Sequence, residues 1–178
     1  MNKYFTIVID RDLIKKYNKY YFKKNPKCRK SYFMNNWKNK KKKPVELYSA
    51  LSLNELLPIN PPQYSVLKKQ WGEFGKWVCK QYKLENKQFT NGIIEYRTYN
   101  ETRTTKDVDN VVAKILNDGL LVSSGMFMDD SYKFLNPYIS SMEYDKDYPR
   151  LEIRISVMDD KVKDIYEKIK IHMDNFKN

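Results

Sequence analysis

Alternation of apolar and polar residues predicts four strands along the chain. The pattern is clearest in LEIRISV, residues 151–157, where aliphatic residues alternate with polar ones, as in a strand with one buried face. Residues 138–144 precede it across DKDYP, and together they predict a hairpin with a longer loop. Residues 4–9 and residues 93–99, the latter after the turn dipeptide NG, are rich in β-branched and aromatic residues and predict two more strands.

A helical period of apolar residues predicts two longer helices. One spans Val66–Leu84, after LLPINPPQYS, whose prolines exclude a helix interior. Its Gly72 and Gly75 weaken this prediction. The other follows a cap at Asp159 or Asp160. Their apolar faces consist of Leu67, Trp71, Phe74, Val78 and Tyr82 in the first, and of Val162, Ile165, Ile169, Met173 and Phe176 in the second.

A third predicted helix is short, Val111–Asn117, with Asn110 as its N-cap and Gly119 as its stop. Its buried face would carry Val111, Val112, Ile115 and Leu116, and its other side Lys114, Asn117 and Asp118. The turn SSG then leads into the apolar run Met126–Met128, which we interpret as a short strand. This order of elements predicts an α+β fold with a mixed, mainly antiparallel sheet and helices packed on it.

Basic residues are concentrated in one segment, the basic arm Lys15–Lys43. The formal net charge is +12, and this arm holds 13 Lys or Arg and no Asp or Glu, against 21 basic and 22 acidic residues elsewhere. Interleaved aromatic residues favour a polyanion such as nucleic acid as its ligand. The alternative is a coding bias, since the chain is rich in Lys, Asn, Tyr and Ile. The aromatic residues of the arm are Tyr17, Tyr20, Tyr21, Phe22, Tyr32, Phe33 and Trp37, and its densest lysines are Lys38, Lys40, Lys41, Lys42 and Lys43.

Cysteine and histidine are too scarce for several kinds of site. Cys28 and Cys79 form no CxxC pattern, and His172 is the single histidine, which argues against a zinc site, a disulfide framework and a Ser-His-Asp triad. No apolar run approaches the ~20 residues that span a bilayer. The first ten residues lack the apolar region of a signal peptide, so we expect a soluble intracellular protein.

Two acidic pairs stand out in this basic chain. Asp107 and Asp109 in KDVDN lie two residues apart, so on an extended segment they share a face, where a cation would relieve their repulsion. Asp129 and Asp130 in MDD would supply a further ligand. Oxygen ligands of this kind suit Mg²⁺, which uses few carboxylates and takes substrate phosphate into its shell. Lys114 would stabilise charge on that phosphate.

At these residues the sequence resembles the RusA-type Holliday junction resolvases. That family has a DxDN motif, a lysine in the following helix, an aspartate four residues after the lysine, and a DD pair beyond. The corresponding elements are KDVDN, Lys114, Asp118 and MDD. Lys114 comes five residues after Asp109, whereas the family lysine usually comes four residues after its second motif aspartate. The resemblance covers about Leu51–Val157 and is best from Arg103 to Ser131.

The resemblance implies a Mg²⁺-dependent endonuclease, with Mn²⁺ as an alternative to Mg²⁺, that resolves four-way DNA by paired symmetrical nicks in recombination and repair. It implies Asp107, Asp109 and Asp130 as metal ligands, Asp129 as a supporting residue and Lys114 as catalytic. Further implications are a homodimer and a setting in the cytoplasm of a bacterial or phage-infected cell. The residues expected to contact DNA are Arg103, Lys106, Lys38, Lys40, Lys41, Lys42 and Lys43.

Under this resemblance the chain divides into three parts: an N-terminal strand with the basic arm (1–50), a RusA-like catalytic core (51–158) and a C-terminal amphipathic helix (159–178). Three alternatives remain. The same site would cut flaps, forks or other branched DNA; or the chain is an inactive nucleic-acid-binding module of the same fold; or the carboxylates are solvated turn residues of a structural domain.

Overall fold

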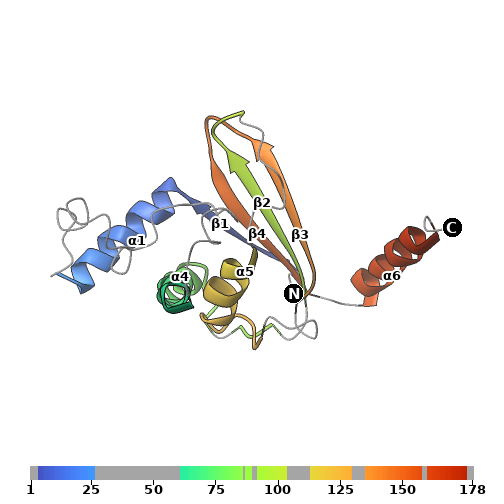
Figure 1. Ribbon diagram of the computed structural model, residues 1–178, viewed down its shortest axis with the longest axis horizontal. Helices are drawn as coiled ribbons and strands as arrows, with labels where there is room; N and C mark the ends of the chain where they lie inside the picture. The colour runs from blue at the N-terminus through green and yellow to red at the C-terminus, as the bar shows by residue number, and fades with distance from the viewer. Residues whose placement is uncertain are drawn as a thin grey trace.

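Within the described part of the chain, four strands form one mixed sheet, in the order β1-β4-β2-β3. The computed structural model describes residues 4–26, 61–85, 87–89, 92–103, 113–129, 135–157 and 160–175 (Figure 1). The strands are β1 (Tyr4–Asp10), β2 (Gly92–Asn100), β3 (Leu135–Tyr144) and β4 (Arg150–Val157). β4 is antiparallel to both β1 and β2, whereas β2 and β3 are parallel. The four predicted strands and the α+β class are therefore confirmed.

The predicted hairpin of the last two strands is wrong. β3 and β4 lie on opposite sides of β2, whose Tyr96 is opposite Ser140 of β3 and Ile153 of β4. Residues 145–149 therefore cross over two inter-strand spacings, roughly 10 Å, instead of closing a turn between neighbours. This arrangement places the alternating residues Ile94 and Tyr96, both fully buried, in the middle of the sheet.

Helix α1 (Arg11–Lys24) forms the first part of the basic arm. Asp10 caps it, because its Oδ1 accepts a hydrogen bond of 2.7 Å from the backbone N–H of Leu13. Its inner side carries Tyr17, whose ring lies 4.9 Å from that of Phe74 and is buried. Tyr17 is therefore a core residue and is not available to stack on bases. The lysines of α1, which are Lys15, Lys16, Lys19, Lys23 and Lys24, are all exposed.

Helix α4 (Pro61–Gln81) begins five residues earlier than predicted. Pro61 and Pro62 fit its first turn, where a backbone N–H has no partner inside the helix to lose. The predicted apolar face is confirmed, with Trp71 and Phe74 in the core. In Figure 1 the helices α1, α4 and α5 lie to one side of the sheet.

The predicted short helix continues beyond its predicted stop. Helix α5 (Ala113–Ile115) runs directly into the π-helix η3 (Leu116–Val122), which passes through Gly119. Asn110, Val111 and Val112 lie outside the described residues. Gly119 has a packing role in place of the predicted stop: a Cβ there would stand 2.6 Å from the Cβ of Trp71. Glycine at this position therefore allows η3 to lie in close contact with α4.

Helix α6 (Asp160–Asn175) follows β4 and stands apart from the other elements (Figure 1). Ile165 and Ile169 of its predicted apolar stripe are 57% and 53% exposed. His172 is exposed as well. Among the described helices there is none with both the length and the apolar character to cross a membrane.

Candidate functional site

The carboxylate of Asp118 is the centre of a polar cluster between α4 and η3. Its Oδ2 accepts a hydrogen bond of 2.9 Å from the hydroxyl of Tyr64. The same oxygen lies 3.5 Å from Nζ of Lys114 and 3.7 Å from Nζ of Lys68. Asp118 was predicted on the exposed side of its helix, and this prediction is wrong, because its side chain is only 9% exposed.

Asp118 is buried because α4 packs against its side of η3. Tyr64 and Lys68, which occupy one face of α4 one turn apart, both contact its carboxylate. The prediction treated this side of the helix as open to solvent. The turn after Asp118 is π-helical, because its carbonyl accepts from the N–H of Ser123, five residues on, at 3.2 Å.

The contact between α4 and η3 is unusually close. A Cβ at Gly75 would stand 2.5 Å from the carbonyl oxygen of Leu120, and one at Gly72 would stand 2.7 Å from the Cβ of Ser123. These glycines, which weakened the helix prediction, therefore allow the two backbones to approach. On the sheet side, the Tyr96 hydroxyl donates to Oδ1 of Asn117. Neighbouring residues of the π-helix are thus tied to the sheet and to α4.

Lys114 and Asp129 are the two described members of the predicted catalytic and metal-binding sets. Lys114 is exposed, as predicted, and pairs with Asp118 across one helical turn. Asp129 is also exposed. It comes two residues after the buried Phe127. Phe127 forms one isolated parallel β-bridge with Phe89 and does not belong to a longer strand. The predicted strand Met126–Met128 is therefore wrong in extent.

Arg103 lies at the other end of β2 from Asp129. Its Cζ is 5.0 Å from the centre of the Tyr144 ring, beyond the ends of β2 and β3, whereas Phe127 pairs with a residue that precedes β2. The nine residues of β2 span roughly 27 Å. Any DNA contact of Arg103 would therefore involve a different part of the DNA from one near Asp129.

Most of the predicted site lies outside the described residues. This applies to Asp107, Asp109, Asp130 and Lys106, and to Lys38, Lys40, Lys41, Lys42 and Lys43. Among the residues that are described, no three His, Cys, Asp or Glu side chains gather in a group that would hold a metal. The donor chemistry of the predicted set, four carboxylates, fits a hard divalent cation.

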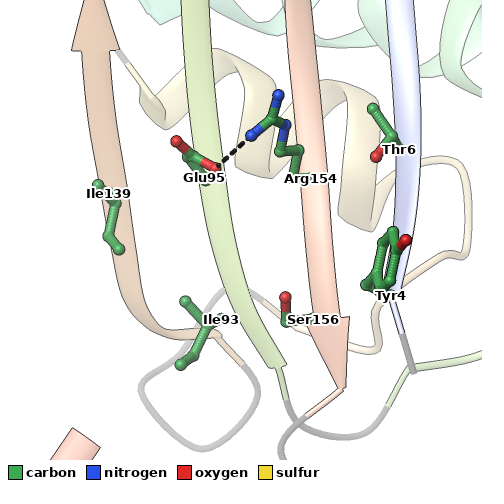
Figure 2. A pocket seen from close by; sticks show the side chains of 7 residues that line it. All are labelled: Tyr4, Thr6, Ile93, Glu95, Ile139, Arg154 and Ser156. Atoms are coloured by element: carbon green, nitrogen blue, oxygen red, sulfur yellow. Dashed lines mark hydrogen bonds and ion pairs between the residues drawn. The ribbon is translucent and has the colours of Figure 1, made fainter. Parts of the chain in front are cut away.

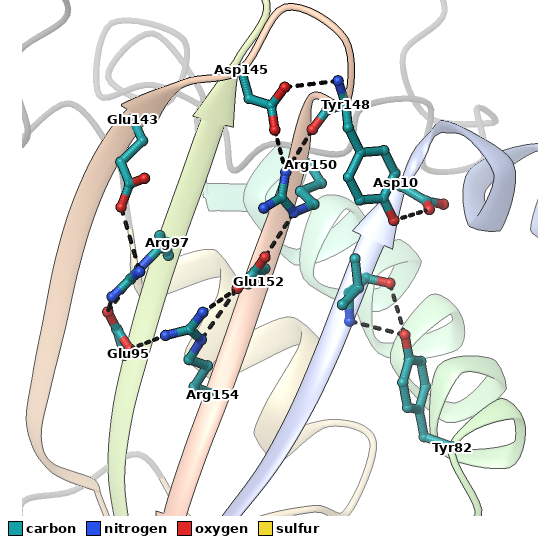
Figure 3. Close-up of polar contacts among 11 residues, drawn as sticks. Asp10, Tyr82, Glu95, Arg97, Glu143, Asp145, Tyr148, Arg150, Glu152 and Arg154 are labelled. Carbon is teal, nitrogen blue, oxygen red and sulfur yellow. Dashed lines mark hydrogen bonds and ion pairs between the residues drawn. The ribbon is translucent and has the colours of Figure 1, made fainter.

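The face of the sheet away from the helices carries a network of alternating charges (Figure 3). Glu95 lies opposite Arg154 and Arg97 lies opposite Glu152 in the register of β2 and β4, a pairing that stabilises neighbouring strands. Burial would raise the pKa of Glu152, but hydrogen bonds from Arg150 and Arg154 lower it below its ordinary value. These arginines are engaged by carboxylates, which favours a structural role for the network over phosphate binding.

A hollow of about 430 Å³ lies on the same face (Figure 2). Side chains from all four strands line it, and the ion pair between Glu95 and Arg154, at 3.5 Å, crosses it. Its lining mixes aliphatic and neutralised charged groups: Tyr4, Thr6, Ile93, Glu95, Ile139, Arg154 and Ser156. Sequence reasoning did not identify this hollow, because it depends on the strand order.

Sequence reasoning also missed Tyr64 and Lys68. Lys68 lies on the predicted helix, but Tyr64 precedes its predicted start at Val66, and no local signal identified Asp118 as their common partner. Comparison with models of known protein families found no match, and comparison with curated protein sequences found none with significant similarity.

Proposed function

We propose that this protein is a Mg²⁺-dependent endonuclease that resolves four-way DNA junctions by paired nicks. The observation that carries the proposal is the order of chemical groups between Asp107 and Asp130: two carboxylates, a helical lysine, an aspartate one turn later and a carboxylate pair. The ion pair of Lys114 with Asp118 supports it, because it joins two members of that series.

The carboxylates of Asp107, Asp109 and Asp130 would hold the cation, with Asp129 in support. A divalent cation bound there supplies polarisation of the scissile phosphate and a bound water of lowered pKa. Lys114 would place its ammonium group against the phosphate and neutralise the charge that develops on its oxygens. Asp118 and Tyr64 restrict the positions that this ammonium group can take. The products would carry a 5′-phosphate and a 3′-hydroxyl.

The exposed lysines of α1 support a DNA substrate. They form the outer side of a helix whose inner side, with Ile14 and Tyr17, is buried, so their charge faces solvent, where it attracts phosphates. Lys15 also pairs with Asp12, at 3.2 Å. A homodimer would match the substrate, because a two-fold axis places one site on each of two opposed strands. The proposal includes a location in the cytoplasm of a bacterial or phage-infected cell.

Nicking of labelled four-way, three-way, flap and linear DNA, with Mg²⁺ and with chelator, tests the proposal. Paired nicks in the four-way junction that need Mg²⁺ are expected. Faster nicking of flaps or forks would indicate that the same site acts on another kind of branched DNA. Binding without nicks, with Mg²⁺ and with Mn²⁺, would contradict the enzyme and leave a nucleic-acid-binding module.

A further inference from the structure

Two lysines from different helices share one carboxylate oxygen. Lys114 lies on α5 and Lys68 on α4, and both amines approach Oδ2 of Asp118, at 3.5 Å and 3.7 Å. Because both contacts are to the same atom, the amines are no further apart than the sum of these two distances. Like charges held this close to each other attract a second anion.

The charges of this cluster are layered from inside to outside. The Asp118 side chain is 9% exposed, whereas those of Lys68 and Lys114 are 43% and 64% exposed. Among the groups that the structure describes in this cluster, one carboxylate and two ammonium groups leave an excess of one positive charge on the solvent side. An anion that approaches from solvent therefore meets the two amines before it meets the carboxylate.

The position of the cluster is fixed by packing. The Tyr64 hydroxyl holds Oδ2 at 2.9 Å, and the Cβ of Trp71, one turn after Lys68, leaves no room for a side chain at residue 119. Helix α4 therefore has little freedom to slide along η3. Groups that are already ordered lose less conformational freedom when they bind a ligand.

We propose that Lys68 is a second phosphate-binding residue beside Lys114, and that the two amines contact one phosphodiester group of bound nucleic acid. Asp118 is the residue that positions both. Ammonium groups make charge-assisted hydrogen bonds to phosphate oxygens. That the ligand is a nucleic acid rests on the proposed function. The added residue, Lys68, lies on α4 and belongs to none of the motifs of the proposed site.

Salt-dependent binding of the full chain to a labelled four-way junction tests this role, in chelator so that cleavage does not interfere. Lys68→Gln should weaken binding roughly tenfold at low salt. The slope of log K against log salt should fall by about one, as expected for one lost phosphate contact. Lys69→Gln is the matched control, since Lys69 is exposed, adjacent and on the same helix, and its slope should be that of the wild type.

A purely structural Lys68 would alter the melting temperature without changing this slope. Lys68→Arg keeps the charge and should restore the wild-type slope. If Lys68→Gln does not fold, Lys68→Met, which keeps the apolar stem, takes its place. A folded variant that binds with the wild-type slope would overturn the inference.

Scoring Mg²⁺-dependent nicking on the same proteins separates the two proposals. Absence of nicking by the wild type, with a reduced slope in the Lys68 variant, contradicts the nuclease and leaves the phosphate-binding pair. Normal nicking with an unchanged slope contradicts the pair alone.

Discussion

Replacing Asp118 by asparagine removes the charge at the centre of the polar cluster and keeps the shape of the side chain. The Tyr64 hydroxyl would then donate to a neutral amide oxygen, which is weaker than its present bond to a carboxylate by about 1 kcal/mol. The pairs with Lys68 and Lys114 would also be lost. Because both lysines are partly exposed, each pair contributes only about 0.2–1 kcal/mol.

Together these contributions predict that Asp118→Asn lowers the free energy of unfolding by about 1.5–3 kcal/mol. For a chain of this length, that corresponds to a fall in melting temperature of roughly 3–12 °C. Urea unfolding, followed by tryptophan fluorescence, and thermal unfolding, followed by circular dichroism, measure the two quantities.

The control is Asp164→Asn on α6. Asp164 also pairs with a lysine four residues away, at 2.7 Å, but the side chains of Lys168 and Asp164 are 72% and 61% exposed. Its loss should cost less than about 0.5 kcal/mol. If both variants unfold at the same urea concentration, the buried position of Asp118 carries no energetic weight and our reasoning on the cluster is refuted.

Three further changes test the fold around the site. Gly75→Ala should destabilise by about 1–2 kcal/mol in urea unfolding, because overpacking against the Leu120 carbonyl exceeds the gain in helix propensity; a more stable variant would contradict the close contact. Tyr82→Phe should cost about 1 kcal/mol, since its hydroxyl accepts from the Val8 N–H and donates to the Val8 carbonyl, both at 2.9 Å; unchanged stability would contradict that bridge. The lowered pKa of Glu152 stabilises the folded state above the unfolded pKa, and this contribution is lost as pH falls below about 5. Acid unfolding of Glu152→Gln should therefore show a shallower loss of stability than the wild type, and identical acid curves would contradict it.

Strand positions could be predicted from the sequence because one face of the sheet is buried. The apolar residues that alternate over residues 151–157 are those of the buried face, and β4 has the predicted extent to within one residue. The pattern within a strand does not indicate which other strand it pairs with. Insertion of β2 between β3 and β4 depends on hydrogen bonds between segments about 50 residues apart. The alternation of apolar and polar residues within β3 and β4 would be the same in a hairpin, so it could not distinguish the two arrangements.

Asp118 shows why the site was harder to predict than the fold. A period of 3.6 residues places it opposite the apolar face, but α4 covers that side of η3, and Tyr64 and Lys68 contact its carboxylate. Gly72 and Gly75 weaken a helix prediction when the segment is considered alone, but in the structure they permit the contact that brings Lys68 to Asp118. Both effects depend on packing between two elements, and this packing cannot be predicted from the sequence of either element alone.

The most direct test of the proposed nuclease is cleavage of a synthetic four-way junction by the Asp107→Asn, Asp130→Asn double variant. The account predicts Mg²⁺-dependent paired nicks with the wild type, and loss of nicking with retained junction binding and an unchanged melting temperature in the double variant. Nicking by the double variant at the wild-type rate would contradict the account.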